Sequence, residues 1–240
     1  MPAIPVSPSV DEHMRRLSEE GVEHIILSWT LGGYPCRNIA AAAKYFYERC
    51  DYSAQDSPYY EAEKKFSEAF REFPFHVNTL YKGPHNAGPS NLLFEQPTGY
   101  KATMTCFAYD DVESWRSIYP VDVFETQLAR LCDKWRAGLD MIPESDESEL
   151  SVMARAAYCL FKSSLNQIRF VRARDAGDYE CAIEAARDEL DITMLMLCQM
   201  NKNAAIGYEA ANHYYFSKGQ LAEKIVNCHH VIRVFGEKLQ

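Results

Sequence analysis

Apolar residues recur every three or four positions through most of this chain, which is the pattern of amphipathic helices. The second half carries this pattern most regularly, and it predicts four helices at 121–142, 149–173, 178–201 and 221–235. Ser217 and Gln220 have capping-box spacing just before the last of these helices. We therefore expect residues 120–240 to form an antiparallel helical bundle.

The first 50 residues show a different order of elements. A helix over 7–21, with Ser7 or Ser9 as its N-cap, is followed at 22–29 by VEHIILSW, whose crowded apolar residues predict a strand buried on both faces. The loop LGGYPCRN and a helix over 38–49 come next. A helix, a doubly buried strand and a glycine-rich loop are typical of the last unit of an α/β barrel.

That single strand has no obvious partner within the sequence. A buried strand needs neighbours for its backbone groups, so we expect a partner chain, an upstream barrel or a second copy of this chain to supply them.

The middle of the chain, 51–119, begins with a helix over 59–73 that ends at Pro74. Residues 74–119 then carry prolines, glycines and asparagines without a helical period, and KATMTCFAY is their best candidate for a short strand. A long irregular segment inside a compact domain is usually functional. The expected organisation is a barrel-like αβα segment at 1–50, a helix with aromatic-rich loops at 51–119 and a mainly α bundle at 120–240.

Composition excludes several classes of protein. The net charge is −9 and the sequence has no basic cluster that would compensate for it locally, which argues against nucleic-acid binding. No apolar run reaches the roughly 18 residues of a membrane span, and MPAIPVSPSV is not expected to be a signal peptide. The eight cysteines are scattered without a C-x-x-C pair, which favours reduced thiols used as small apolar residues in a cytoplasmic protein.

Four longer stretches carry a family resemblance: GVEHIILSWTLGGYPCRN, FSEAFREFPFHVNTLYKGPHNAGPSNLLF, TGYKATMTCFAYDDVESWRSIYP and IGYEAANHYYF. Together they resemble the C-terminal region of large bacterial proteins of the glycoside-hydrolase type, in which a TIM-like barrel precedes a helical domain. The resemblance runs from about residue 5 to residue 235. It implies that Trp29 and Tyr34 lie at the carboxyl end of the last barrel strand, as the floor of a sugar subsite. It also implies that the earlier strands, which carry the acid and the nucleophile, are absent from these 240 residues.

The acidic candidates for such chemistry are few. Glycoside hydrolysis needs two carboxyl groups roughly 5 to 10 Å apart across the scissile bond. One of Asp110 and Asp111 could instead cap a short helix, and Glu95 could be a solvated or backbone-bonded loop acid. The candidate carboxylates are Glu95, Asp110, Asp111 and Glu209.

Candidate sugar contacts combine flat aromatic rings with amides and imidazoles. Residues 76–115 contain this mixture, although an aromatic-rich loop can equally be a lid packed on its own core. The candidates in this segment are His85, Asn86, Tyr100 and Trp115.

The stretch IGYEAANHYYF adds an acid, an amide and an imidazole. Glu209, Asn212 and His213 share one face if this stretch is helical, where they could contact a substrate or form a structural salt link and cap. A di-metal bundle needs Glu-x-x-His on two helices, and the spacing here is Glu-x-x-x-His, so we expect no metal. The sequence also lacks a nucleophile elbow, a P-loop and a dinucleotide fingerprint, so we expect no cofactor.

Two functions are consistent with these patterns. The chain is either the C-terminal part of a carbohydrate-active hydrolase, inactive alone and contributing to a cleft, or a non-catalytic helical scaffold that binds a saccharide or a protein. In both cases the expected partners are a carbohydrate ligand and a second copy or an upstream barrel chain.

Overall fold

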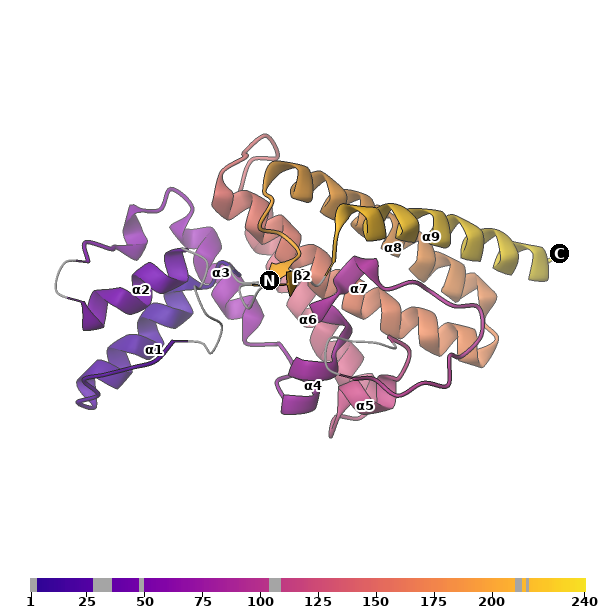
Figure 1. Ribbon diagram of the computed structural model, residues 1–240, viewed down its shortest axis with the longest axis horizontal. Helices are drawn as coiled ribbons and strands as arrows, with labels where there is room; N and C mark the ends of the chain where they lie inside the picture. Colours follow the sequence, from indigo (N-terminus) through magenta and orange to yellow (C-terminus); the bar gives the residue numbers. More distant parts are fainter. Residues whose placement is uncertain (1–3, 28–35, 48–49, 104–108, 210–212, 215) are drawn as a thin grey trace.

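The computed structural model describes residues 4–27, 36–47, 50–103, 109–209, 213–214 and 216–240, and this part of the chain is mainly helical, as expected (Figure 1). The helices are α1 (Ser7–Glu19), α2 (Arg37–Phe46), α3 (Tyr60–Phe70), α4 (Val77–Lys82), α5 (Val112–Arg116), α6 (Val121–Leu139), α7 (Glu149–Ala176), α8 (Tyr179–Lys202) and α9 (Lys218–Lys238). Short 3-10 turns lie at Ala54–Asp56, Pro84–Asn86 and Gly88–Ser90, and the strands β1 (Tyr208–Glu209) and β2 (His213–Tyr214) pair with each other.

The helices α6 to α9 form the predicted bundle, in which α7 packs against both α6 and α8, and α8 packs against α9 (Figure 1). Their ends are set by local signals. The Ser148 hydroxyl accepts a hydrogen bond from Ser151 N at 3.3 Å to begin α7, and Gly177 ends that helix in the left-handed conformation. The predicted capping box of α9 is confirmed, because Gln220 accepts from Ser217 N at 2.8 Å.

An aromatic contact joins the first half of the chain to this bundle. The Phe66 ring of α3 stacks on Trp135 of α6 with centroids 4.6 Å apart, and the Trp135 indole donates to the Ala154 carbonyl of α7 at 2.9 Å. Val6, Phe66 and Trp135 belong to one buried core cluster. That cluster therefore contains residues of all three predicted segments, 1–50, 51–119 and 120–240. The boundaries between these segments stay a prediction.

The expected strand at 22–29 is not found in the described residues 22–27. These residues form no strand, and Ile26 is 95% exposed. Residues 28 and 29 lie outside the described residues. Crowded apolar residues indicate burial only when other segments cover them, and no described segment covers Ile26. A barrel unit is accordingly not shown.

The N-cap of the first helix also differs from the prediction. Val6 occupies the N-cap position, and the buried Ser7 hydroxyl donates instead to the Glu63 carboxylate of α3. Ser7 thus ties α1 to a distant helix, a role that its neighbours in sequence do not indicate.

The segment 83–94 is fastened to the bundle by a buried polar network. Glu189 of α8 accepts from the Ser163 hydroxyl at 2.6 Å and from the Lys224 ammonium of α9 at 3.1 Å. Lys224 also donates to the Asn91 carbonyl, and Gln167 of α7 donates to the Gly88 carbonyl at 3.0 Å. Both charges of the Glu189–Lys224 pair are fully buried, so the irregular segment is held on the bundle by groups that cannot be left unpaired.

The stretch 206–216 is not helical where it is described. Tyr208 pairs with Tyr214 and Glu209 pairs with His213 across a short antiparallel ladder. Gly207 has φ +85°, and a Cβ there would lie 2.5 Å from the Phe216 carbonyl, so the chain doubles back too tightly for a helix.

Two helical glycines give a matched test of the α3–α6 contact. A Cβ added at Gly138 of α6 would lie 2.6 Å from the buried Phe66 ring, whereas a Cβ at Gly236 of α9 meets nothing within 4 Å. We expect Gly138→Ala to lower the free energy of unfolding by about 1–3 kcal/mol through overpacking. Gly236→Ala should raise it by up to about 1 kcal/mol through helix propensity. Urea unfolding measures both, and equal effects of the two substitutions would contradict this packing.

Candidate functional site

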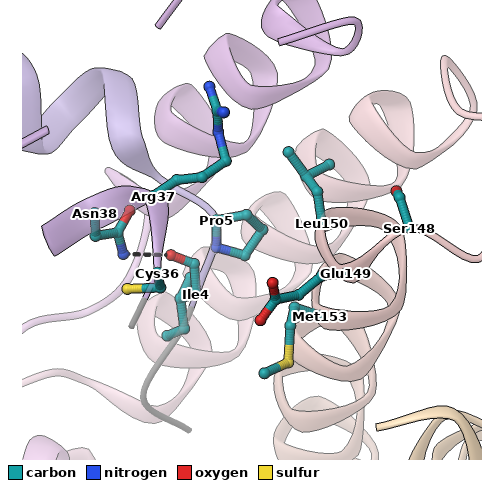
Figure 2. Close-up of a pocket in the computed structure, with 9 residues that line it drawn as sticks. All are labelled: Ile4, Pro5, Cys36, Arg37, Asn38, Ser148, Glu149, Leu150 and Met153. Atoms are coloured by element: carbon teal, nitrogen blue, oxygen red, sulfur yellow. Dashed lines mark hydrogen bonds between the residues drawn. The ribbon is translucent and has the colours of Figure 1, made fainter. Parts of the chain in front are cut away.

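A pocket of about 250 Å³ lies between the segment that precedes α1, the start of α2 and the first turns of α7 (Figure 2). Its lining residues are Ile4, Pro5, Cys36, Arg37, Asn38, Ser148, Glu149, Leu150 and Met153. They fall into two groups, one within 4–38 and the other within 148–153, which are more than 100 residues apart in sequence. The pocket therefore exists only because the start of α7 lies beside the segment before α1 and the start of α2.

Local hydrogen bonds fix both walls of the pocket. On one side, the Asn38 amide donates to the Ile4 carbonyl at 2.7 Å and holds the segment before α1 in place. On the other side, Asp146 accepts from Ser148 N at 3.0 Å and from the Tyr59 hydroxyl at 2.5 Å. Asp146 therefore ties the loop before α7 to the start of α3.

The inner surface of the pocket is mainly aliphatic. Ile4 and Pro5 face Leu150 and Met153, while the Glu149 carboxylate points from α7 toward the opposite wall (Figure 2). No aromatic ring is among the described residues that line it. The Asn38 Oδ1 atom is buried and has no hydrogen-bond partner among the described residues. Because this atom has no accessible surface, a ligand cannot reach it, and the pocket presents apolar walls with the exposed Glu149 carboxylate as its acceptor.

Arg37 contributes its stem rather than its charge. Its guanidinium points away from Glu149 (Figure 2) and bonds Glu63 at 3.2 Å and the Ala54 carbonyl at 3.3 Å. The Glu63 carboxylate is fully buried, so Arg37 is needed there as a counter-charge. An anionic ligand would have to compete with Glu63 for this guanidinium.

The structure brings two of the noted sequence stretches together beside this pocket. Cys36 packs against an apolar cluster that contains Met153 of α7. The same cluster contains Ile206 and Phe216, which flank the β1–β2 ladder in sequence. The end of LGGYPCRN and the two ends of IGYEAANHYYF therefore meet on α7. Trp29, Tyr34 and Asn212 lie outside the described residues, and Glu209 and His213 are described only as backbone partners in the ladder.

Asp110 is a structural tie rather than an exposed acid. Its carboxylate accepts from Thr98 N at 2.8 Å and from the Thr98 hydroxyl at 2.5 Å, and it pairs with the buried Arg174 of α7 at 3.3 Å. Arg174 also donates to the Phe94 and Gln96 carbonyls at 3.2 and 3.4 Å. Together these bonds hold the loop 94–102 against the bundle.

Asp111 occupies the N-cap position of α5, which is one of the two alternatives for this pair. Its carboxylate does not cap the helix but accepts from Ala102 N at 2.7 Å and pairs with Lys101 at 3.3 Å. Both members of the acidic pair are therefore directed at backbone amides of the same loop.

The other acidic and aromatic candidates lie in separate surroundings. Glu95 pairs with His230 of α9 at 2.8 Å on the surface. Trp115 is fully buried and donates to the Tyr109 carbonyl at 3.1 Å, so its ring packs in the core and cannot face a substrate cleft. Tyr100 is 66% exposed, which leaves most of its ring in solvent.

His85 and Asn86 support their own loop. The partly buried His85 ring meets Phe73 edge-on at 5.2 Å, and burial lowers the pKa of His85 to about 4. The Asn86 amide donates to the Leu80 carbonyl at 3.0 Å. These two residues are therefore used to close the turn after α4.

Cys132, Cys159 and Cys228 are buried in the core, as expected of cysteines used as small apolar residues, whereas Cys181 and Cys198 are exposed and do not fit that expectation. Within the described ranges, no group of three histidine, cysteine or acidic side chains is placed to hold a metal ion. The same part of the chain has no helix that is long and apolar enough to cross a membrane.

Comparisons with known proteins give no relative. No protein-family model, curated protein or solved structure matches this chain.

Sequence reasoning missed most of this pocket. Cys36 and Asn38 belong to a loop that the sequence singles out, but Ile4, Leu150 and Met153 carry no local signal, because isolated aliphatic residues are normal in any helix or loop.

The lowered pKa of His85 predicts a pH dependence of stability. Because the folded chain holds this imidazole neutral down to about pH 4, whereas the unfolded chain protonates it near pH 6.5, the unfolded state binds the extra proton. Stability should be complete above about pH 6.5 and decline as the pH falls toward about 4. Urea unfolding across this range measures the slope. His85→Asn should flatten it, while His229→Asn on the exposed face of α9 should not; an unchanged slope in His85→Asn would contradict the assignment.

Substitutions of Asp110 and Glu95 should have different effects on the free energy of unfolding. Asp110→Asn should lower the free energy of unfolding by about 1–3 kcal/mol, because the buried Arg174 loses a charged partner. Glu95→Gln removes only a surface pair and should change it by less than about 0.5 kcal/mol. Urea denaturation of both variants measures these changes. If both substitutions change the free energy of unfolding by less than about 0.5 kcal/mol, Asp110 does not hold the loop 94–102 on the bundle.

Proposed function

We propose that this chain is a non-catalytic helical binding module and that the pocket in Figure 2 is its binding site. The observation that carries the proposal is the lining: aliphatic walls from two distant parts of the chain, with the exposed Glu149 carboxylate as the one acid among the described lining residues. Concave, largely apolar pockets with a few convergent polar groups are the usual form of small-molecule sites.

The arrangement of acids favours binding over hydrolysis by the described residues. Glycoside hydrolysis needs two carboxyl groups facing each other at roughly 5 to 10 Å. Glu149 is the one carboxylate among the described residues of the pocket, and Asp110 and Asp111 bond loop amides elsewhere. The hydrolase interpretation, in which an additional barrel supplies the acid pair, stays a prediction of the resemblance alone.

The lining also selects a ligand class. Aliphatic walls without a described aromatic ring suit an alkyl chain better than the flat face of a sugar. The Glu149 carboxylate accepts hydrogen bonds, and a carboxylate favours a cationic donor over a neutral one. The best-matched ligand is therefore a short amphipathic amine, with an amphipathic alcohol as the weaker analogue.

Titration with n-hexylamine, 1-hexanol and hexanoate tests this proposal. Chemical shifts of the methionine methyl groups report binding, because Met153 lines the pocket. We expect n-hexylamine to shift the Met153 signal at the lowest concentration and hexanoate to have no effect. Glu149→Gln should weaken amine binding by roughly twofold to fivefold, because solvent screens the ion pair of an exposed carboxylate.

Glu147→Gln is the matched control, because Glu147 lies two residues away and pairs with Lys202 instead. Equal affinity in the wild type and Glu149→Gln, or no Met153 shift with any probe, would refute the site. Turnover of aryl glycosides by the purified chain would refute the non-catalytic assignment.

A further inference from the structure

Ser117, directly after α5, has a backbone conformation that is normally reserved for glycine. Its φ of +57° and ψ of −124° are those of the second residue of a type II′ turn, which is closed by the Tyr119 amide donating to the Arg116 carbonyl at 3.2 Å. No other non-glycine residue in the described ranges has a positive φ. A side chain at this position strains the backbone, so glycine would be more stable there unless the hydroxyl group is used.

The Ser117 hydroxyl is bonded to an imidazole. Its Oγ lies 2.7 Å from Nδ1 of His76, the residue that precedes α4, and α4 packs against α5 (Figure 1). The Asn78 amide also donates to His76 Nδ1, at 3.1 Å, so this nitrogen carries a lone pair and Ser117 is the donor in the bond between the two side chains. A serine hydroxyl that donates to an imidazole nitrogen is the arrangement of a nucleophile and its general base.

The Ser117–His76 pair is held in place and is accessible. The Tyr119 hydroxyl donates to the Phe75 carbonyl at 2.7 Å and so joins the two segments that carry the pair. Ser117 and His76 are both only partly buried. The Ile118 backbone N–H donates no hydrogen bond to any described residue. In serine hydrolases the N–H of the residue after the nucleophile stabilises the oxyanion, and here that donor is available.

The same geometry limits the reaction to activated acyl donors. Once His76 Nδ1 has taken the Ser117 proton, it can no longer accept from the Asn78 amide, so proton transfer breaks the bond that caps α4. An amide needs a strong base and protonation of its leaving group, whereas a phenolate leaves without a proton. The pair is therefore suited to an ester with a phenolate leaving group.

The surface around the pair indicates the acyl group. Phe75, Val77 and Ile118 are the sequence neighbours of the pair, and all three side chains are exposed. Exposed apolar side chains gathered at one place mark a surface that contacts an apolar ligand. They favour a short apolar acyl chain over a charged one.

We propose that Ser117 is a site of covalent acylation by aryl esters with a short apolar acyl group. Ser117 Oγ attacks the carbonyl carbon while its proton passes to His76 Nδ1. The new bond between Oγ and the acyl carbon replaces the bond to the phenolate, which departs with the electron pair, and the imidazolium then releases the proton to water. The step consumes Ser117, so it adds a covalent site to the binding module and is independent of the pocket in Figure 2.

Incubation of the full chain with p-nitrophenyl butyrate, followed by peptide mass spectrometry, tests the proposal. We expect a butyryl group on Ser117 that forms roughly 100-fold faster than on the exposed Ser18, because a general base contributes about 10²–10⁴-fold. The ester p-nitrophenyl hydrogen succinate carries a charged acyl group. Relative to its own hydrolysis in buffer, it should acylate Ser117 more slowly than the butyrate does.

Two substitutions each remove one partner while keeping the local fold. His76→Asn retains an N-cap acceptor for α4 but removes the base, so it should slow acylation of Ser117 by roughly 100-fold. Ser117→Gly removes the nucleophile at a position that favours glycine, so the acylated peptide should be lost while the melting temperature is unchanged or higher. Ser18→Ala is the matched control and should leave acylation of Ser117 unchanged.

Three results would overturn the proposal: butyryl groups on lysines alone, acylation of Ser117 no faster than that of Ser18, or a wild-type rate in His76→Asn. In each of these cases the bond between Ser117 and His76 only joins α4 to α5. Binding of n-hexylamine at the pocket in Figure 2 should be the same in the wild type and in both variants, so failure of one proposal is distinguished from failure of the other.

Discussion

A fully buried carboxylate on α8 is the constraint on which the bundle depends. Glu189 can remain charged in the core only if it is paired and hydrogen-bonded, and its partners come from different helices. Ser163 of α7 and Lys224 of α9 both reach it, and Lys224 also holds the Asn91 carbonyl. A one-turn slip of any of the three helices would separate these groups, so the ion pair fixes their register as well as the position of the segment 83–94.

The helix α7 then becomes the common platform for two pockets. Its first turns line the pocket in Figure 2, and Arg155 and Tyr158, less than two turns later, line a second pocket beside α8. The loop before α7 is fastened by Asp146, which bonds Ser148 and Tyr59 through its carboxylate and Arg155 through its carbonyl. One short loop therefore sets the shape of two pockets, and a change in its conformation would alter both.

The residues that most resemble a catalytic site in the sequence have structural roles in the described part of the chain. Asp110, Asp111 and Asn86 all bond backbone groups of the irregular segment, and Trp115 fills its core. A segment without a regular ladder or helix must satisfy its peptide groups with side chains, and asparagine and aspartate are the residues best suited to do so. An irregular segment rich in acids and amides therefore resembles a ligand site in sequence even when its polar groups serve the fold.

The sequence by itself determined the helices of the bundle and the capping box at Ser217 and Gln220, because these depend on periodicity and on neighbours within four residues. It did not determine the fate of Ile26, the pairing of Glu209 with His213 or the lining of either pocket. Each of these depends on which distant segment lies opposite: a strand exists only with a backbone partner, and a pocket exists only between walls. Ile4 and Met153 line the same pocket because α7 lies beside the segment that precedes α1. No local sequence pattern predicts that arrangement.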